Sequence, residues 1–185
     1  MPESREPIRV AGQSLAEIAL ALAERRLPPV EQWQPLHCGH SEMRIAKDGR
    51  WYHQGAPIDR PAMVRLFSTI LRREPDGSHV LVTPGEKLTI DVELAAFVVT
   101  AMTSEGEGTR RRIAFELNSG DAVILGPEHP LRLTAEGVPL VVVRRGLEGS
   151  LSRPVYYEIA ELALTEDAEA PGVWSDGAFF SLEQA

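Results

Sequence analysis

Eight residues combine the side-chain types that bind an anionic, nucleotide-like ligand. Arginine grips a phosphate with two parallel hydrogen bonds, lysine supplies a point charge, and aromatic rings stack on a base. The candidates are Trp51, His53, Arg60, Thr83, Glu86, Lys87, Arg153 and Tyr157. Arg60 and Arg153 each precede a proline that should begin a helix, where the helix dipole disfavours a cation. This unfavourable placement occurs twice, which favours an anionic ligand or an acidic partner for the pair.

The same residues also suit structural roles. The two arginines would then pair with carboxylates of the protein itself. Trp51 and Tyr157 are equally expected in a core or between domains, because large aromatic side chains dominate burial. The residue types fit both interpretations.

A metal site is less well supported. His37-Cys38-Gly39-His40, with Glu42 nearby, resembles the first histidine motif of cupins, but two residues separate the histidines where cupins usually have one. The second cupin motif fails as well, because Gly120, Pro127 and His129 have the wrong spacing. A structural zinc site normally takes four ligands from spaced pairs. We therefore expect no metal site.

Catalytic motifs are not recognisable either. Cys38 has no partner pattern, and no serine occupies a Gly-x-Ser-x-Gly elbow. Gly106-Glu107-Gly108 lacks the Gly-Lys-Ser/Thr of a phosphate loop. Glu86 and Glu116 have the chemistry of a general acid and base, but nothing in the sequence brings them together. We expect binding rather than catalysis, assign no catalytic residue and name no cofactor.

Composition narrows the class of partner and the compartment. The 185 residues include 19 Lys and Arg against 27 Asp and Glu, a net charge of −8. This balance argues against nonspecific nucleic-acid binding, which depends on neutralising phosphates, but allows a small phosphorylated ligand in a local basic pocket. Cys38 is the single cysteine, the amino terminus lacks a signal-peptide pattern, and Glu17 interrupts the longest apolar stretch. We expect a cytoplasmic protein that does not span a membrane.

Three landmarks occur twice in the same order, which indicates an internal duplication. They are Met43–Gly49 with Leu131–Gly137, Ile58–Pro61 with Leu151–Pro154, and Asp76-Gly77 with Asp176-Gly177. When the two Arg-Pro helix starts are superimposed, the following apolar positions fall in the same phase. A duplicated unit has an interface between its copies, and such interfaces are common ligand sites.

The predicted elements define an α+β fold with mainly antiparallel sheets. Ser14 and Glu17 form a capping box for a helix that runs to about Arg26, within an amino-terminal segment 1–30. The first repeat, 31–84, is expected to contain a hairpin turning at 47–49, a helix capped by Asp59 and running to about Arg73, and a strand at 78–82. The second repeat, 85–185, is expected to be β-rich.

In this second repeat, strands near 88–92, 95–102, 110–117 and 121–125 are predicted to extend the sheet of a hairpin at 130–144. About six strands would form that sheet. A helix capped by Ser152 and a final hairpin turning at Asp176-Gly177 complete the unit.

Several of these segments together resemble the bacterial family known as domain of unknown function 1285. They are Trp51-Tyr52-His53, Arg60-Pro61, Leu81–Pro84 with Glu86-Lys87, Arg153–Tyr157 and Val173–Gly177. The resemblance implies a duplicated core, a carboxy-terminal domain superficially like pleckstrin-homology folds, and a ligand site between the domains. It also implies a nucleotide-type ligand and a role in signal transduction.

Our leading hypothesis is therefore a binding protein that holds a small anionic ligand between its two related units, and that transmits a signal by closure of one unit on the other. A protein-interaction adaptor that uses exposed strands of the carboxy-terminal sheet is the first alternative. An enzyme acting on a phosphorylated metabolite is the second.

Overall fold

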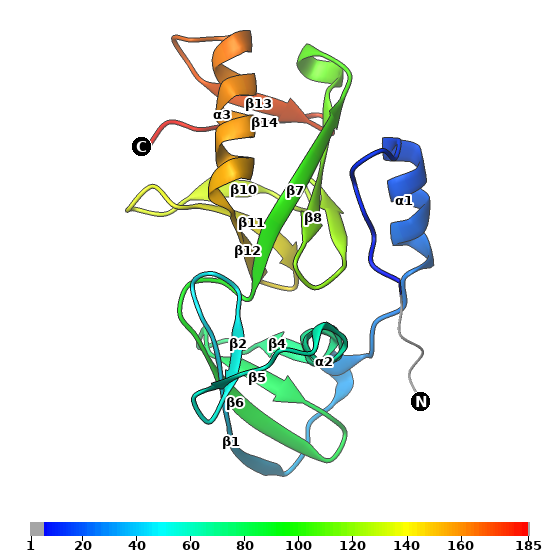
Figure 1. Ribbon diagram of the computed structural model, residues 1–185, viewed down its shortest axis with the longest axis vertical. Coiled ribbons are helices and arrows are strands. Elements are labelled where there is room, and N and C mark those ends of the chain that lie inside the picture. Colours follow the sequence, from blue (N-terminus) through cyan, green and yellow to red (C-terminus); the bar gives the residue numbers. More distant parts are fainter. Residues whose placement is uncertain (1–5, 185) are drawn as a thin grey trace.

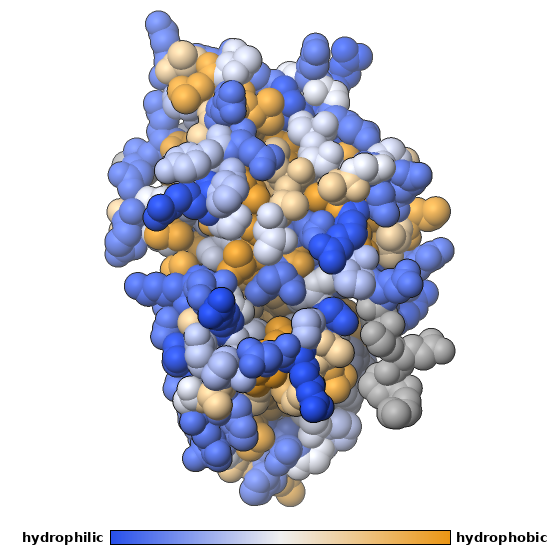
Figure 2. Space-filling view, in the orientation of Figure 1, coloured by the Kyte–Doolittle hydropathy of each residue, from blue (hydrophilic) through white to orange (hydrophobic). Residues whose placement is uncertain are grey.

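Two units, each built around a six-stranded sheet, lie one above the other along the long axis of the molecule (Figure 1). The computed structural model describes residues 6–184. Hydrophilic side chains cover most of the face seen in Figure 2. No helix within residues 6–184 is long and apolar enough to cross a membrane.

The first unit has the strand order β3-β2-β1-β6-β5-β4. Its strands are β1 (His37–Ile45), β2 (Trp51–His53), β3 (Ala56–Pro57), β4 (Leu71–Arg73), β5 (His79–Val82) and β6 (Glu86–Val92). Neighbouring strands are antiparallel except β1 and β6, which are parallel. A 3-10 helix, η1 (Val30–Gln32), and the helix α2 (Pro61–Thr69) complete the unit.

The second unit has the order β10-β11-β12-β7-β8-β9. Its strands are β7 (Phe97–Glu105), β8 (Arg112–Leu117), β9 (Ala122–Ile124), β10 (Leu131–Leu133), β11 (Pro139–Arg144) and β12 (Leu147–Leu151). The 3-10 helix η2 (Gly108–Arg110) follows β7, and α3 (Arg153–Glu166) follows β12. A separate hairpin, β13 (Gly172–Ser175) and β14 (Ala178–Ser181), turns at Asp176-Gly177 as predicted.

The two sheets have the same topology. In chain order each consists of two three-stranded meanders, and the first strand lies parallel to the sixth at the centre of the sheet. The predicted duplication and the mainly antiparallel pairing are confirmed. The equivalent strands are not the ones that the sequence landmarks suggest. By topology, β1–β6 of the first unit correspond to β7–β12 of the second. The landmarks would instead make β1 and β2 correspond to β10 and β11.

The strand predicted at 88–92 belongs to the first sheet, so its predicted place in the second sheet is wrong. Here β6 lies between β1 and β5, and Ile90 is buried in the core. The sixth strand of the second sheet is instead β12, which follows a tight turn at Arg145-Gly146. A short apolar strand fits either sheet by its pattern, so only pairing decides which one it joins.

The first Arg-Pro helix begins one residue later and ends earlier than expected. Arg60, not Asp59, is the N-cap residue, because Pro61 occupies the first helical turn. The helix ends at Thr69, and residues 71–73, predicted as its last turn, form β4. Leu71 pairs with Leu81 of β5 and is buried, so sheet hydrogen bonds and burial outweigh the helical spacing.

The amino-terminal helix α1 (Leu15–Glu24) packs on the second unit, on the β8 and β9 side of its sheet (Figure 1). Its capping box is present, with the Ser14 side chain accepting from the Glu17 amide. Leu15 and Ile18 are buried together with Ala114 and Ala122. The chain therefore passes from the second unit to the first before β1 begins.

One continuous hydrophobic core joins the two units. Ile45, Trp51 and Leu71 of the first unit belong to the same buried cluster as Phe97 and Leu147 of the second. The turn before β2 fits closely against this join. A Cβ atom on Gly49, whose φ is +87°, would lie 2.7 Å from Asn118 Nδ2 and from Val98 Cγ2. The predicted hairpin is confirmed, and its glycine is needed both for the turn and for the contact with the second unit.

Candidate functional site

Arginine side chains and backbone carbonyl groups join the two units. Arg73 Nη1 of β4 donates to the Gly146 carbonyl oxygen at 2.9 Å, in the turn between β11 and β12. Arg144 Nη2 donates to the Ser68 carbonyl oxygen at 2.6 Å, near the end of α2. Burial lowers the pKa of Arg144, but an arginine keeps its charge at any physiological pH. Each unit therefore contributes an arginine whose guanidinium donates to a backbone carbonyl of the other unit.

A cleft of about 660 Å³ opens at this interface. Its lining residues come from η1, the β4–β5 hairpin and the β11–β12 turn: Glu31, Gln34, Arg72, Arg73, Glu74, Pro75, Gly77, Arg145 and Gly146. We call this the interdomain cleft. Three arginines and two glutamates give its lining a formal charge of +1 in a chain of net charge −8. The cleft is thus locally positive, and its volume is in the range of small-molecule sites.

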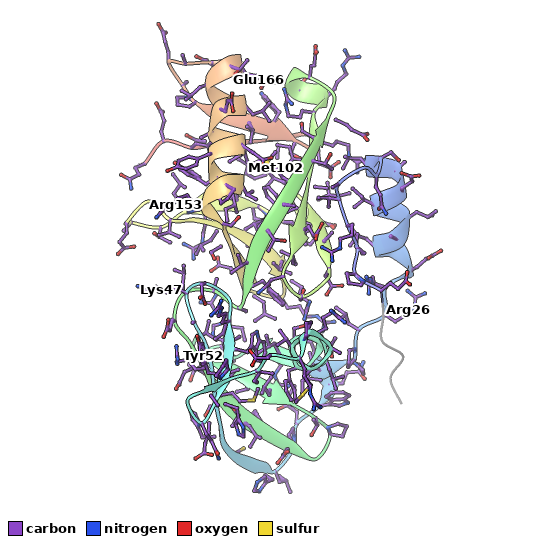
Figure 3. The ribbon with its side chains drawn as sticks, viewed as in Figure 1. Arg26, Lys47, Tyr52, Met102, Arg153 and Glu166 are labelled. Atoms are coloured by element: carbon purple, nitrogen blue, oxygen red, sulfur yellow. The ribbon has the colours of Figure 1, made fainter. Side chains whose placement is uncertain are left out.

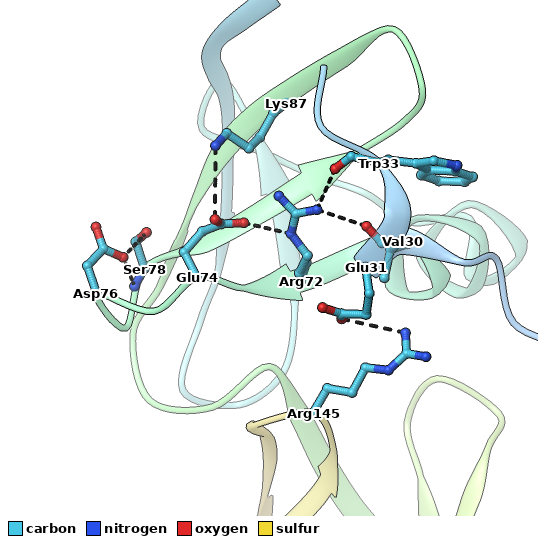
Figure 4. A network of polar contacts seen from close by, with 9 residues as sticks. All are labelled: Val30, Glu31, Trp33, Arg72, Glu74, Asp76, Ser78, Lys87 and Arg145. Atoms are coloured by element: carbon cyan, nitrogen blue, oxygen red, sulfur yellow. Dashed lines mark hydrogen bonds and ion pairs between the residues drawn. The ribbon is translucent and has the colours of Figure 1, made fainter. Parts of the chain in front are cut away.

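Arg72 is the most buried arginine in the lining of the interdomain cleft. It is 5% exposed, and its Nε donates to Glu74 Oε1 at 2.7 Å. Its Nη1 donates to the carbonyl oxygens of Val30 and Trp33, each at 2.8 Å (Figure 4). A buried guanidinium with these partners holds the η1 segment against the sheet. Arg72 therefore has a structural role, through its Nε and Nη1 contacts.

Arg73 and Arg145 are the more accessible cations, and they come from different units. Their side chains are 38% and 54% exposed. Arg145 Nη1 lies 3.5 Å from Glu31 Oε1 (Figure 4). Arg73 Nη1 lies 3.9 Å from Glu148 Oε2, but Glu148 already accepts two hydrogen bonds from Arg132. Both guanidinium groups keep donors that a ligand in the cleft can use.

Arg145 has an unusual backbone conformation. Its φ is +46° and that of Gly146 is +80°, the left-handed pair required by a tight hairpin turn. Asparagine, aspartate and glycine suit the first position of such a turn, whereas a long side chain there costs about 1 kcal/mol. The turn itself does not require arginine. The side chain lines the interdomain cleft and pairs with Glu31.

His79 lies next to Arg73 in the register of β4 and β5. Burial lowers its pKa, the nearby Arg73 lowers it further, and Glu148 acts in the opposite direction. The imidazole is consequently neutral at pH 7 and adds no charge to the interface.

The predicted site residues do not form one cluster. Arg60 begins α2 in the first unit, and Arg153 begins α3 in the second, where Figure 3 shows it at the base of the helix. Within residues 6–184 neither guanidinium has an ion-pair partner, and no polar contact joins the two. Tyr157 lies on the exposed face of α3, and His53 is exposed at the end of β2.

The other predicted residues have structural partners. Trp51 is 2% exposed and stacks on Phe67 with the ring centroids 6.2 Å apart. Thr83 Oγ1 accepts from the Glu86 amide at 3.2 Å in the turn before β6. Lys87 Nζ lies 4.0 Å from Glu74 Oε2, which connects it to the rim of the interdomain cleft.

Sequence reasoning missed Glu31, Arg73 and Arg145. Each comes from a different segment of the chain, so no sequence motif contains more than one of them. One local signal was available: Arg145-Gly146 separates two apolar strands where Asn-Gly or Asp-Gly is usual. An arginine at that position stands out as unsuited to the turn.

The histidines near β1 have carboxylate neighbours without forming a metal cluster. His37 Nε2 lies 4.0 Å from Glu86 Oε2, and His40 Nε2 lies 3.6 Å from Asp91 Oδ1. Throughout the part of the chain that the structure describes, no group of three potential metal ligands converges.

This fold and cleft define a duplicated α+β protein whose two units share an arginine-lined interface. The chain belongs to the DUF1285 family, as the sequence indicated. The domain of unknown function (DUF1285), N-terminal domain, matches residues 28–95, and the protein of unknown function (DUF1285), C-terminal domain, matches residues 96–182. The two matches meet between β6 and β7, where one six-stranded sheet ends and the next begins.

Solved structures of the family share the fold. A DUF1285 family protein from Silicibacter pomeroyi DSS-3 is 40% identical, with a TM-score of 0.80 over 95% of this chain and 97% of that one. A second, from Shewanella baltica OS155, is 23% identical, with a TM-score of 0.53 over 64% of this chain and 90% of that one. No curated protein matches the chain.

Proposed function

We propose that this protein binds a small anionic, nucleotide-like ligand in the interdomain cleft and that binding changes how closely its two units associate. The observation that carries the proposal is Arg145, an arginine in a left-handed turn position whose side chain lines the cleft. Residues kept in costly conformations concentrate at functional sites. A role in signal transduction would follow if closure of the cleft altered a surface that a partner recognises.

The chemistry of the interdomain cleft suits a phosphate group best. Arg73 and Arg145 present planar donors from the two units, and a phosphate between them would make charge-assisted contacts with both. Gln34, also in the lining, offers a donor and an acceptor for a base. A ligand held by both arginines would stabilise the joined arrangement of the units.

The direct test is titration with pyrophosphate and with ATP at constant ionic strength, followed by two-dimensional NMR and calorimetry. We expect amide shifts concentrated at residues 30–34, 72–77 and 145–146. Arg145→Gln should weaken binding about tenfold, the loss of one hydrogen bond to a charged group. The control Arg60→Gln/Arg153→Gln should bind as the wild type does. Binding that is lost in this control but kept in Arg145→Gln would move the site to the helix starts, and absence of binding to both anions would refute the proposal.

The two alternatives receive less support. An adaptor that used the edges of the second sheet would have only β9 and β10, each three residues long. An enzyme using Glu86 and Glu116 would need the two carboxylates together. Glu86 lies in the first sheet, whereas Glu116, in the second, is largely buried and accepts hydrogen bonds from Arg9 and from the Val10 amide.

A further inference from the structure

One edge of β1 is unpaired along its first half. Residues His37–His40 pair with β6, but β2 pairs only with Met43–Ile45 on the other side. Within residues 6–184 no strand pairs with residues 37–41 on the side of β1 that faces away from β6. His37, Cys38, Gly39 and His40 are all exposed. Native proteins usually cover or block such an edge, because its free amide and carbonyl groups recruit another strand.

A bulge at Glu42 separates the paired and the open parts of β1. Glu42 has a φ of +58°, and the register of β1 against β6 shifts between His40 and Arg44. The Gln54 amide, at the end of β2, donates to the Glu42 carbonyl oxygen at 2.9 Å. The hairpin partner therefore stops at the bulge, and the open edge begins there. We call residues 37–41 the open edge.

The side chains around the open edge indicate what would lie beside it. Gly39 is paired with Leu88, and a Cβ atom on Gly39 would lie 3.2 Å from Leu88 Cδ2. The half-buried Leu88 side chain thus lies over the glycine, within reach of a neighbouring apolar side chain. Exposed carboxylates lie near both ends of the edge. Glu86 is on the neighbouring strand β6, with its Oε2 4.0 Å from His37 Nε2, and Glu42 is at the bulge, where its Oε2 also accepts from Gln54 Nε2.

We propose that the open edge binds an extended segment of another protein, in which an apolar residue is flanked at two-residue spacing by lysine or arginine. The apolar side chain would contact Leu88, and the cations would face Glu86 and Glu42. Strand addition of this kind gains affinity from main-chain hydrogen bonds and specificity from alternate side chains. This inference is independent of the ligand proposed for the interdomain cleft.

A second copy of this chain fits the open edge less well. A pairing of five residues buries far less than the roughly 1,200 Å² that a stable interface needs. Each copy also carries a net charge of −8, so two copies repel each other, whereas a basic segment is attracted. The small area therefore argues against a stable dimer, and the charge favours a basic peptide.

The test uses the full chain and the peptide acetyl-Thr-Lys-Thr-Val-Thr-Lys-Thr-amide, followed by two-dimensional NMR. We expect amide shifts and slowed exchange confined to residues 37–42 and their β6 neighbours. Glu42→Gln/Glu86→Gln should weaken binding about tenfold, since two charge contacts are lost. The control Glu128→Gln/Glu136→Gln makes the same change in net charge on exposed turns of the second unit and should bind as the wild type does.

A second peptide, N-methylated at alternate residues, keeps the charges but cannot form the main-chain ladder, and it should not bind. Equal binding of both peptides, equal weakening in the two double variants, or shifts centred outside 37–42 would overturn the proposal. Protection of residues 37–41 in the free protein, with a mass that doubles as concentration rises, would identify a second copy as the occupant and would also overturn it.

Discussion

Arg145 of the second unit and Glu31 of the first face each other across the interdomain cleft, with 3.5 Å between Nη1 and Oε1. Both side chains are about half exposed. An ion pair this accessible contributes little to stability, so an incoming anion can replace the carboxylate at small cost. Glu31 thus occupies the position on Arg145 that a ligand phosphate would take.

Glu31→Gln should therefore strengthen pyrophosphate binding, by about threefold to tenfold, because a competing carboxylate is removed from Arg145. Calorimetry at constant ionic strength measures the change. Glu136→Gln, an exposed charge change in the second unit, should leave the affinity as it is. Weaker binding by Glu31→Gln would mean that Glu31 assists the ligand and does not compete with it.

Arg145→Asn should make the protein more stable while weakening anion binding. Asparagine tolerates the left-handed conformation, so relief of strain should raise the free energy of unfolding by about 0.5–1 kcal/mol. Urea denaturation measures the first effect and pyrophosphate titration the second. Gln54→Asn changes another turn residue of positive φ, +50°, outside the cleft, and should leave anion binding unchanged. Normal anion binding by Arg145→Asn would remove the functional reason for the arginine.

Gly49→Ala should destabilise the join of the two units. The substitution forces alanine into a φ of +87° and places its Cβ against Asn118 and Val98, so a loss of about 3 kcal/mol is expected. Gly55→Ala is the matched control, because Gly55 has a φ of +81° but open space around it. Its loss should be only about 1 kcal/mol, from backbone strain. Equal losses in urea denaturation would show that the contact with the second unit contributes nothing.

His79 should make the protein less stable in mild acid. Its pKa is lowered in the folded state, mainly by burial, so below about pH 6.5 the unfolded chain binds a proton that the native state does not. Stability should then fall as the pH drops from 6.5 towards the lowered value. His79→Gln should reduce the difference in free energy of unfolding between pH 7.5 and pH 5.5, whereas the exposed His53→Gln should preserve it. The same pH dependence in His79→Gln and the wild type would contradict this assignment.

Local signals in the sequence were sufficient for several elements. Ser14 and Glu17 specify a helix start because their side chains satisfy backbone donors three residues apart. Asp48-Gly49 and Asp176-Gly177 specify tight turns because few residues adopt positive φ at low cost. The helix after Arg60-Pro61 was less well determined, since apolar spacing continued into β4 and only pairing with β5 ended the helix at Thr69.

The candidate site depended more on the tertiary structure. Arg60 and Arg153 were chosen for their repeated position, and the structure places each at an exposed helix start, outside the lining of the interdomain cleft. The interdomain cleft instead takes Glu31, Arg73 and Arg145 from three separate segments. No spacing rule relates them, because their meeting depends on how the two units pack.

By itself, the sequence determined the α+β class, the duplication, the family, and the turns and caps that depend on chemistry within a few residues. The tertiary structure alone decided that β6 belongs to the first sheet, that α1 packs on the second unit, and that Arg145 faces Glu31. The difference is physical. Caps and turns are set by backbone geometry over three or four residues, whereas strand partners and clefts are set by burial and pairing summed over the whole chain.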